Sequence, residues 1–239
     1  VNVVKYINTK NEEETNKIPR STIVSSLDIP SKYFIERGFS KDILLKYDVG
    51  DCNTASKPMF GRAVVPVYDQ DYKYMVGCTG RSIDNKCNKC SCYHKSSECP
   101  PEDKQYLHSK WRHNFGFKTQ NHLYNYWFAK DHIKKTGKVI LVESPGNVWR
   151  LEEAGIHNSV ALFGASLADI QKMILDISGA MTIYTIMDND DAGKKAAENI
   201  YKKCERIYNV HNIELEQADV ASMNVDQVKD FIKPRIDHD

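Results

Sequence analysis

Two stretches decide the fold of this chain: Lys138-Val-Ile-Leu-Val-Glu143 and Ile183-Tyr-Thr-Ile-Met-Asp-Asn-Asp-Asp-Ala-Gly193. Each begins as an apolar run of strand length and then reaches one or more carboxylates. From Lys138 onward, strand-like runs alternate with stretches that have the length and composition of helices. Alternation at this spacing predicts a parallel α/β sheet covered by helices.

The predicted elements of this sheet follow one another closely. After a strand at 138–142 we expect, in chain order, a helix at 147–155, a strand at 159–163, a helix at 166–177, a strand at 181–187, a helix at 191–207 and a short strand near 212–215. Functional groups in such sheets gather at the carboxyl edge, where the strands end. Glu143, Asp188 and Asp190 should therefore lie together at that edge.

Three carboxylates at one edge point to a cation. Like charges placed close together repel and raise a pKa unless a cation offsets them. Mg²⁺ is the natural counter-ion, because it prefers oxygen ligands and keeps positions for water and substrate phosphates; Mn²⁺ is the alternative. Acidic residues at strand-to-helix turns also cap helices, and we expect Asp191 to be such a cap. A cap needs one carboxylate, so three of them favour a metal site.

The first half of the chain has a different character. Residues 1–20 include a polar, charged stretch without apolar periodicity, which predicts a linker or flexible arm. Two short helices are expected within 33–47, with Ser40 capping the second. Apolar runs at 62–68 and 72–77, separated by Asp-Gln-Asp, predict a hairpin.

These patterns together predict an α/β protein in which an α+β subdomain precedes a parallel α/β sheet. We expect a linker at 1–20, a basic subdomain at 21–137 with a Cys-rich insertion at 84–110, and a catalytic subdomain at 138–239.

Charge is distributed unevenly along the 239 residues, although the net charge is only +1. Residues 1–137 carry 22 Lys and Arg against 15 Asp and Glu, whereas residues 138–239 carry 11 against 17. A basic half suits a polyanion and an acidic half suits cations, although uneven surface charge alone gives the same count. No apolar run approaches the roughly 20 residues of a membrane helix. Because residue 1 is Val and no leader pattern follows, we expect a fragment or a processed chain without a membrane segment.

Four of the seven cysteines fall within 13 residues: Cys87, Cys90, Cys92 and Cys99. This clustering is more typical of a metal knuckle in a reducing, intracellular compartment than of a secreted disulfide scaffold. His94 lies inside the cluster, so either four Cys or three Cys with His94 complete a tetrahedral Zn²⁺ site. Free thiols and disulfide or cluster chemistry remain alternatives.

The acidic motifs resemble a known family. The residues that carry the resemblance are Glu143 after the first strand, Gly164 and Ser166 after the second, and Asp188-x-Asp190-x-Ala192-Gly193 after the third. Together they resemble the Toprim domain, which bacterial-type primases, topoisomerases and some nucleases share. The resemblance covers about 138–215 and implies that Glu143, Asp188 and Asp190 are catalytic metal ligands. The resemblance further implies that Asp219 matches a metal-binding acid of primases.

Motifs upstream of the Toprim-like part narrow the resemblance to DnaG-type primase polymerase cores, over about 31–215. They are Tyr33-Phe-Ile-Glu-Arg-Gly-Phe-Ser40, Phe60-Gly-Arg62-x-x-x-Pro66, Gly77-x-x-Gly80-Arg81, Lys110-Trp111 and Leu123-Tyr124-Asn125. The resemblance implies phosphate contacts by Arg62, Arg81, Lys110 and Lys118. Trp111, flanked by cations, is a candidate for base stacking. Alternatively, the two arginines are ordinary surface residues. The cysteine cluster and a compact stretch at 114–123 depart from bacterial primases and suggest a phage-like relative.

The resemblance implies a DNA primase catalytic core that makes short RNA primers from ribonucleoside triphosphates on single-stranded DNA. The chain lacks the Gly-x4-Gly-Lys-Ser/Thr phosphate loop, so we expect a separate replicative helicase. The expected location is the cytoplasm, that of the host if the protein is viral. The alternatives are a Toprim-type metal-dependent nuclease and a non-catalytic single-stranded nucleic-acid-binding module.

Overall fold

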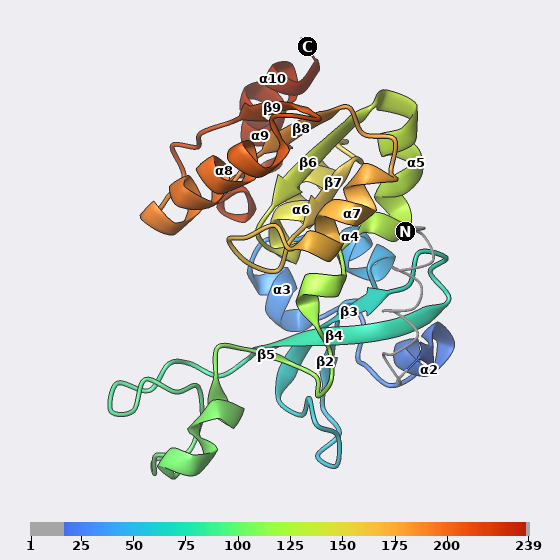
Figure 1. The fold of residues 1–239 in the computed structure, drawn as a ribbon. Helices are drawn as coiled ribbons and strands as arrows, with labels where there is room; N and C mark the ends of the chain where they lie inside the picture. The colour runs from blue at the N-terminus through green and yellow to red at the C-terminus, as the bar shows by residue number, and fades with distance from the viewer. Residues whose placement is uncertain (1–16, 238–239) are drawn as a thin grey trace. The chain divides into compact units, whose positions relative to one another are not determined.

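A parallel sheet forms where the alternating pattern predicts it. The computed structural model describes residues 17–237, and in it four parallel strands lie in the order β7-β6-β8-β9 (Figure 1). Their bounds are β6 Lys138–Val142, β7 Ser159–Ala161, β8 Thr182–Thr185 and β9 Asn209–Asn212. The predicted α/β class is confirmed, and β9 begins three residues earlier than the expected strand at 212–215.

Successive side chains along each strand point to opposite faces of this sheet. Val139, Leu141 and Ile183 are fully buried in one hydrophobic cluster with side chains of three helices. These helices are α5 Tyr126–Thr136, α7 Asp169–Asp176 and α8 Asp191–Cys204. Tyr184 serves the other face, and its hydroxyl donates to the Ile236 carbonyl oxygen at 3.5 Å. The remaining helices of this part are α6 Pro145–Glu153, α9 Val225–Phe231 and α10 Lys233–Asp237, with short 3-10 turns η2 Thr119–Asn121 and η3 Val220–Ser222.

An antiparallel sheet precedes it in the chain. Its strands are β1 Ile18–Pro19, β2 Gly50–Cys52, β3 Arg62–Tyr68, β4 Tyr74–Ser82 and β5 Trp111–His113. Their order is β1-β4-β3-β2, and β5 pairs with the end of β4. The pairing of β3 with β4 confirms the predicted hairpin.

Short helices accompany this sheet: α2 Arg20–Val24, α3 Lys32–Glu36, α4 Lys41–Lys46 and the 3-10 turn η1 Glu102–His108. Ser40 caps α4 as predicted, since its hydroxyl accepts from the Ile43 N–H at 3.3 Å. Ser31 caps α3 in the same way, accepting from the Phe34 N–H at 3.4 Å. Serine caps therefore set the start of both helices.

Two glycines of β4 make room for neighbouring side chains. A Cβ at Gly77 would lie 2.0 Å from the Phe117 ring, and a Cβ at Gly80 would lie 3.0 Å from the Arg62 side chain. The spacing Gly-x-x-Gly-Arg in this strand thus has a packing reason, because both glycines are approached closely by large side chains.

The chain forms two compact units, one ending at Phe117 and the other beginning at Lys118. The expected subdomain boundary lies 20 residues later, between 137 and 138. The difference arises because Ala129 and Ile133 of α5 belong to the core of the parallel sheet. The proposed linker at 1–20 falls almost wholly on residues outside the described range, which begins at Lys17. Within 17–237, none of the helices has the length and apolar composition of a membrane-spanning segment.

Candidate active site and metal centre

The acidic residues gather at the carboxyl edge of the parallel sheet. Glu143 directly follows β6, and Asp188 and Asp190 follow β8, the strand paired with β6. The Asp188 N–H donates to Glu143 Oε1 at 3.1 Å, so these two residues lie side by side. The parallel register thus brings together acids that are 45 residues apart in the sequence.

These carboxylates hold charge that the chain does not neutralise. Burial, together with the charges of Glu143 and Asp219, raises the pKa of Asp188 to about 6. Burial also raises the pKa of Glu143, with added repulsion from Asp190 and Asp219. Within 17–237, no Lys or Arg forms an ion pair with any of the four acids. Glu143, Asp188 and Asp219 are partly buried and Asp190 is exposed, and an all-oxygen set of this kind suits a hard divalent cation.

Asn147 is a member of this site that sequence reasoning missed. It is buried in the first turns of α6, where its Nδ2 donates to Asp188 Oδ1 at 3.3 Å. Its Oδ1 accepts from the Ala221 N–H at 3.0 Å, two residues after Asp219. Asn147 therefore ties the Asp188 side chain to the segment that carries Asp219. An Asn near a helix start looks like an ordinary surface residue in the sequence, and only its burial singles it out.

Two of the acids also cap helical turns. Asp190 Oδ1 accepts from the Gly193 N–H at 2.8 Å and caps α8, so the expectation that Asp191 is the cap is wrong: Asp191 is the first helical residue. Asp219 Oδ1 accepts from the Ser222 N–H at 2.7 Å and caps η3. A carboxylate has two oxygens, so capping by one leaves the other able to bind a cation. The assignment of both as metal ligands stays a prediction.

Glycines shape the backbone around the acids. A Cβ at Gly193 would lie only 2.0 Å from the Asp188 carbonyl oxygen, which explains the glycine that closes the Asp-x-Asp-x-Ala-Gly motif. Gly164 has φ +153° and donates its N–H to the Glu143 carbonyl oxygen at 3.1 Å. The backbone on both sides of the acidic pair is thereby held.

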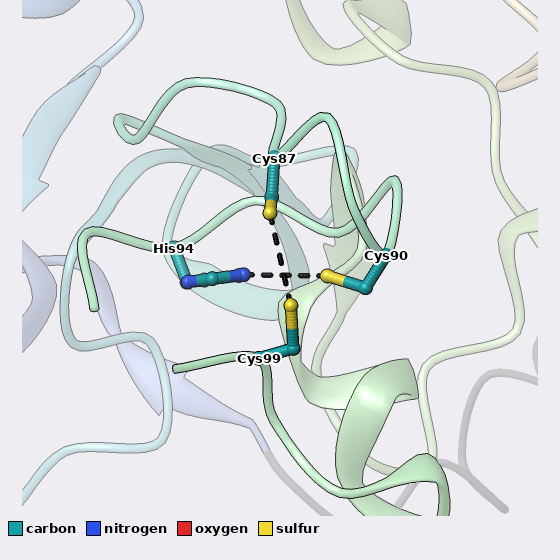
Figure 2. Close-up of side chains that lie close together, drawn as sticks. All are labelled: Cys87, Cys90, His94 and Cys99. Atoms are coloured by element: carbon teal, nitrogen blue, oxygen red, sulfur yellow. Dashed lines mark hydrogen bonds between the residues drawn. The ribbon is translucent and has the colours of Figure 1, made fainter. Parts of the chain in front are cut away.

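A second cluster lies in the loop between β4 and β5 (Figure 2). The ligand atoms of Cys87, Cys90, His94 and Cys99 all lie within 4.8 Å of one another. Within the described residues, this is the one group of three or more metal-ligating side chains that converges so closely; the carboxylates do not. Of the two ligand sets expected, the structure brings together the one with three Cys and His94. Cys92 is not part of it.

Arg62 and Arg81, two predicted phosphate contacts, are buried within their own unit. Arg62 donates from Nη1 to the carbonyl oxygen of Gly80 at 2.9 Å, and from Nη2 to those of Leu107 at 2.7 Å and Ser109 at 3.1 Å. Arg62 therefore fastens the end of the Cys-rich segment to β4. The alternative interpretation, that Arg62 is an ordinary surface residue, does not fit its burial. Its phosphate contact stays a prediction.

Arg81 is buried in a different way. Its Nη1 donates to the Ser82 carbonyl oxygen at 2.6 Å, and its guanidinium lies over the rings of Tyr33 and Tyr93. Backbone and aromatic neighbours thus surround this cation, and its phosphate contact also stays a prediction.

The other predicted contacts are accessible. Lys110 and Lys118 are exposed, and the Trp111 side chain is 38% exposed at the start of β5. Its ring stacks on Phe34 at 6.4 Å between centroids and an angle of 28°. A ring that is partly exposed and supported by a neighbouring ring is suited to base stacking. Lys118 belongs to the unit of the parallel sheet and the other two to the antiparallel unit.

Comparison with known proteins agrees with this arrangement. Residues 137–213 match the Toprim domain family. The DNA primase of Helicobacter pylori is 31% identical over 170 residues, which cover 69% of this chain and 27% of the relative. The DNA primase of Aquifex aeolicus is 37% identical over 83 residues, 35% of this chain and 16% of the relative. The chain thus spans about a quarter or less of the length of these relatives.

Solved structures share the fold. The Aquifex aeolicus primase structure with zinc-binding and RNA polymerase domains aligns over 87% of this chain and 54% of that chain, with a TM-score of 0.63 and 22% identity. The RNA polymerase domain of Mycobacterium tuberculosis primase DnaG aligns over 90% of this chain and 83% of its own, with a TM-score of 0.66 and 14% identity. The fold resemblance inferred from the sequence motifs is thereby confirmed.

Proposed function

We propose that this chain, which has the fold of a DnaG-type primase catalytic core and contains a Toprim domain, synthesises short RNA primers on single-stranded DNA. The observation that carries the proposal is the acidic edge of the parallel sheet. There Glu143 and Asp188 are held side by side, half-buried and without an internal cation, inside the segment that matches the Toprim family. Such a site suits metal-assisted phosphoryl transfer.

Glu143, Asp188 and Asp190, with Asp219, would hold Mg²⁺ or Mn²⁺. Held there, such ions would supply activation of the primer 3′-hydroxyl, charge stabilisation on the α-phosphate and assistance to the departing pyrophosphate. Asn147 orients the Asp188 carboxylate through its hydrogen bond, and Gly193 lets α8 begin directly against the Asp188 carbonyl. Positioning of this kind matters because a displaced ligand weakens charge stabilisation in the transition state.

Template and triphosphates are the partners we infer. Lys110 and Lys118 offer exposed charge, Trp111 offers a partly exposed ring, and residues 1–137 carry the excess of Lys and Arg. A DnaG catalytic domain of the same fold, 16% identical with a TM-score of 0.62, has been solved bound to single-stranded DNA. A separate replicative helicase is a further partner that we infer, and the 239 residues of this chain contain no phosphate-loop motif. The clustered cysteines favour an intracellular compartment, and we expect Zn²⁺ to occupy their site.

The test is synthesis on a single-stranded DNA template with labelled ribonucleoside triphosphates. We expect short, template-dependent RNA products with Mg²⁺ or Mn²⁺ and none after chelation. Glu143→Gln removes one charge at nearly constant volume and should reduce the yield by at least about a hundredfold. Because Asp188 donates its backbone N–H to this side chain, thermal melting must show that the variant is folded.

The same assay separates the alternatives. Cleavage of the DNA in the absence of ribonucleotides would favour a Toprim nuclease. Binding of DNA with neither synthesis nor cleavage, across templates of varied sequence, would overturn the proposal in favour of a binding module.

A further inference from the structure

We propose that Cys87, Cys90, His94 and Cys99 bind one zinc ion, that Cys92 is not a ligand, and that the ion holds the β4–β5 segment in its fold. This inference does not depend on primer synthesis. It concerns a site in the antiparallel unit, whereas the acids belong to the other unit.

The distances fit a tetrahedral site. Cys87 Sγ and Cys99 Sγ lie 3.9 Å apart, and Cys90 Sγ lies 3.3 Å from His94 Nε2. In tetrahedral zinc sites with Zn–S of about 2.3 Å and Zn–N of about 2.0 Å, two sulfurs lie about 3.8 Å apart and a sulfur and a nitrogen about 3.5 Å. Figure 2 shows the four side chains pointing toward one centre from different parts of the loop.

Groups around the ligands orient them. His94 Nδ1 lies 3.0 Å from the Ser96 carbonyl oxygen, which fixes the hydrogen on Nδ1 and leaves Nε2 as the lone-pair nitrogen facing the cysteines. The Lys89 N–H donates to Cys87 Sγ at 3.4 Å, inside the Cys87-x-x-Cys90 turn. Outer hydrogen bonds to a ligating imidazole and thiolate are the usual support of zinc sites.

The donor set selects zinc over other ions. Three sulfurs and one imidazole exclude Mg²⁺ and Ca²⁺, which take oxygen ligands, and iron–sulfur centres are usually held by four thiolates. The clustered cysteines form no disulfide in this conformation; the Cys87 and Cys99 sulfurs, for example, lie 3.9 Å apart, far longer than the S–S bond of about 2.05 Å. Four protein ligands leave no open position, so the site is structural and not catalytic.

The loop needs such a centre, because it has no apolar core of its own. Within 84–110, every residue is exposed or only partly buried, and η1 contains no buried residue. The backbone is tied together at a few points: Cys87 N–H donates to the Cys92 carbonyl at 2.7 Å, and Tyr93 N–H donates to the His108 carbonyl at 2.8 Å. A metal supplies the missing stabilisation in small segments of this kind.

The buried arginines connect the metal loop to the sheet. The Arg81 guanidinium lies over the ring of Tyr93, 4.8 Å from its centroid, and Tyr93 directly precedes the ligand His94. Arg62 binds the carbonyls of Leu107 and Ser109, where the loop returns to β5. The two arginines thus fix the loop at Tyr93 and again at Leu107 and Ser109. Zinc holds the part of the loop that carries the ligands.

Cys92 supplies a matched control within the same loop. Its Sγ lies 3.8 Å from the Gln105 carbonyl oxygen and is not one of the four converging ligand atoms, although its backbone belongs to the same turn. Cys92 is only two residues from Cys90 and two from His94. Its exclusion from the site therefore follows from the geometry of the loop and not from its position in the sequence.

The experiment measures zinc in the purified chain and in two single variants, Cys99→Ser and Cys92→Ser. We expect one zinc per chain in the wild type and in Cys92→Ser, and an affinity at least about a hundredfold weaker in Cys99→Ser. Equal loss of zinc in Cys92→Ser and Cys99→Ser would overturn the ligand set. Absence of stoichiometric zinc from the folded wild type, even after incubation with Zn²⁺, would overturn the site.

A second measurement uses the wild type alone, so that a poorly folding variant cannot decide the outcome. A thiol reagent should react with Cys92 in the native protein and with three further thiols only when a chelator has removed the metal. Replacement of zinc by Co²⁺ should give the intense visible bands of a tetrahedral thiolate site, unchanged in Cys92→Ser. A cobalt spectrum with octahedral, weak bands, or protection of all four clustered thiols, would overturn the proposal.

Discussion

The carboxylates at the edge of the parallel sheet and the arginines of the antiparallel sheet differ in how their charges are compensated. Glu143 and Asp188 are half-buried beside one another, without a cation from within residues 17–237. Arg62 and Arg81 are buried too, but carbonyl oxygens and aromatic rings surround them. Partly buried carboxylates without a cationic partner require a cation from outside the chain. Buried guanidinium groups that donate to carbonyl oxygens instead stabilise the fold. We therefore expect the acidic edge to act in catalysis and the buried arginines to stabilise the fold.

The largest effect should come from the acids. Asp188→Asn and Asp190→Asn remove a charge with almost no change in volume, and Asn caps a helix as well as Asp does. We expect each to reduce primer synthesis by at least about a hundredfold, because a metal ligand is lost. The fold should persist, as measured by circular dichroism and thermal melting.

Asp191→Asn is the matched control, since Asp191 is exposed in the same turn and is the first residue of α8, not its cap. Its synthesis should remain near that of the wild type. Near-normal synthesis by both Asp188→Asn and Asp190→Asn would remove the acids from the catalytic role.

The second effect separates structural from binding cations. Arg62→Met leaves three carbonyl acceptors without their donor and should cost about 3 kcal/mol of unfolding free energy, measured with urea. Lys110→Met concerns an exposed side chain and should leave stability unchanged. It should weaken single-stranded DNA binding and lower the salt slope by about 1.

Equal destabilisation by the two variants would contradict this division of roles. A lowered salt slope in a folded Arg62 variant would restore its predicted phosphate contact.

A third effect concerns the glycine that closes the acidic motif. In Gly193→Ala the new Cβ would meet the Asp188 carbonyl oxygen, so the β8–α8 turn must shift. We expect a loss of about 2 kcal/mol in stability, within the range of overpacking, and a fall in synthesis. Ala192→Gly, in the same turn, has only the backbone cost of up to about 1 kcal/mol and should keep its activity. Equal activity in both variants would argue against a role for this turn in placing Asp188.

The elements that the sequence predicted best are those with strong periodicity. The strands at 138–142 and 181–187 are apolar runs that end at acids, and parallel pairing alone then brings Glu143 to Asp188. The last strand was predicted three residues too late, because Asn209–Asn212 has no apolar pattern and is mostly exposed. Helix α5 joins the parallel sheet through Ala129 and Ile133, a packing choice that local sequence does not reveal.

The details of the sites were less accessible from sequence. In an irregular loop, spacing does not determine which side chains converge, so His94 and Cys92 could not be told apart as ligands. The burial of Arg62 depends on carbonyls of residues 107 and 109, far along the chain. Asn147 escaped notice because its partners, Asp188 and Ala221, lie 41 and 74 residues away. Long-range side-chain contacts carry this information, and periodicity does not.

The smallest effect is a pH dependence of the metal-free protein. The pKa of Asp188 is raised to about 6, chiefly by burial, while the unfolded chain keeps an ordinary Asp pKa of about 3.9. Between these values the folded state binds the proton more tightly, so this group's contribution to stability falls as pH rises from about 4 to 6 and is level above. Asp188→Asn cannot ionise and escapes this loss.

The measurement is therefore the difference in melting temperature between Asp188→Asn and the wild type, both metal-free, at pH 4.5 and pH 7. Because the carboxylate is only partly buried, solvent screening reduces the effect to about 1 kcal/mol, or about 2–4 °C for a chain of this size. The variant should gain this advantage at pH 7 and have little of it at pH 4.5, where the wild-type group is mostly protonated. Mg²⁺ at pH 7 should erase the advantage, because it binds the ionised wild type and offsets the repulsion. A difference that is the same at both pH values, or that Mg²⁺ leaves unchanged, would mean that the charge at Asp188 is matched from within, as it is at Arg62, and the contrast between the two regions would fail.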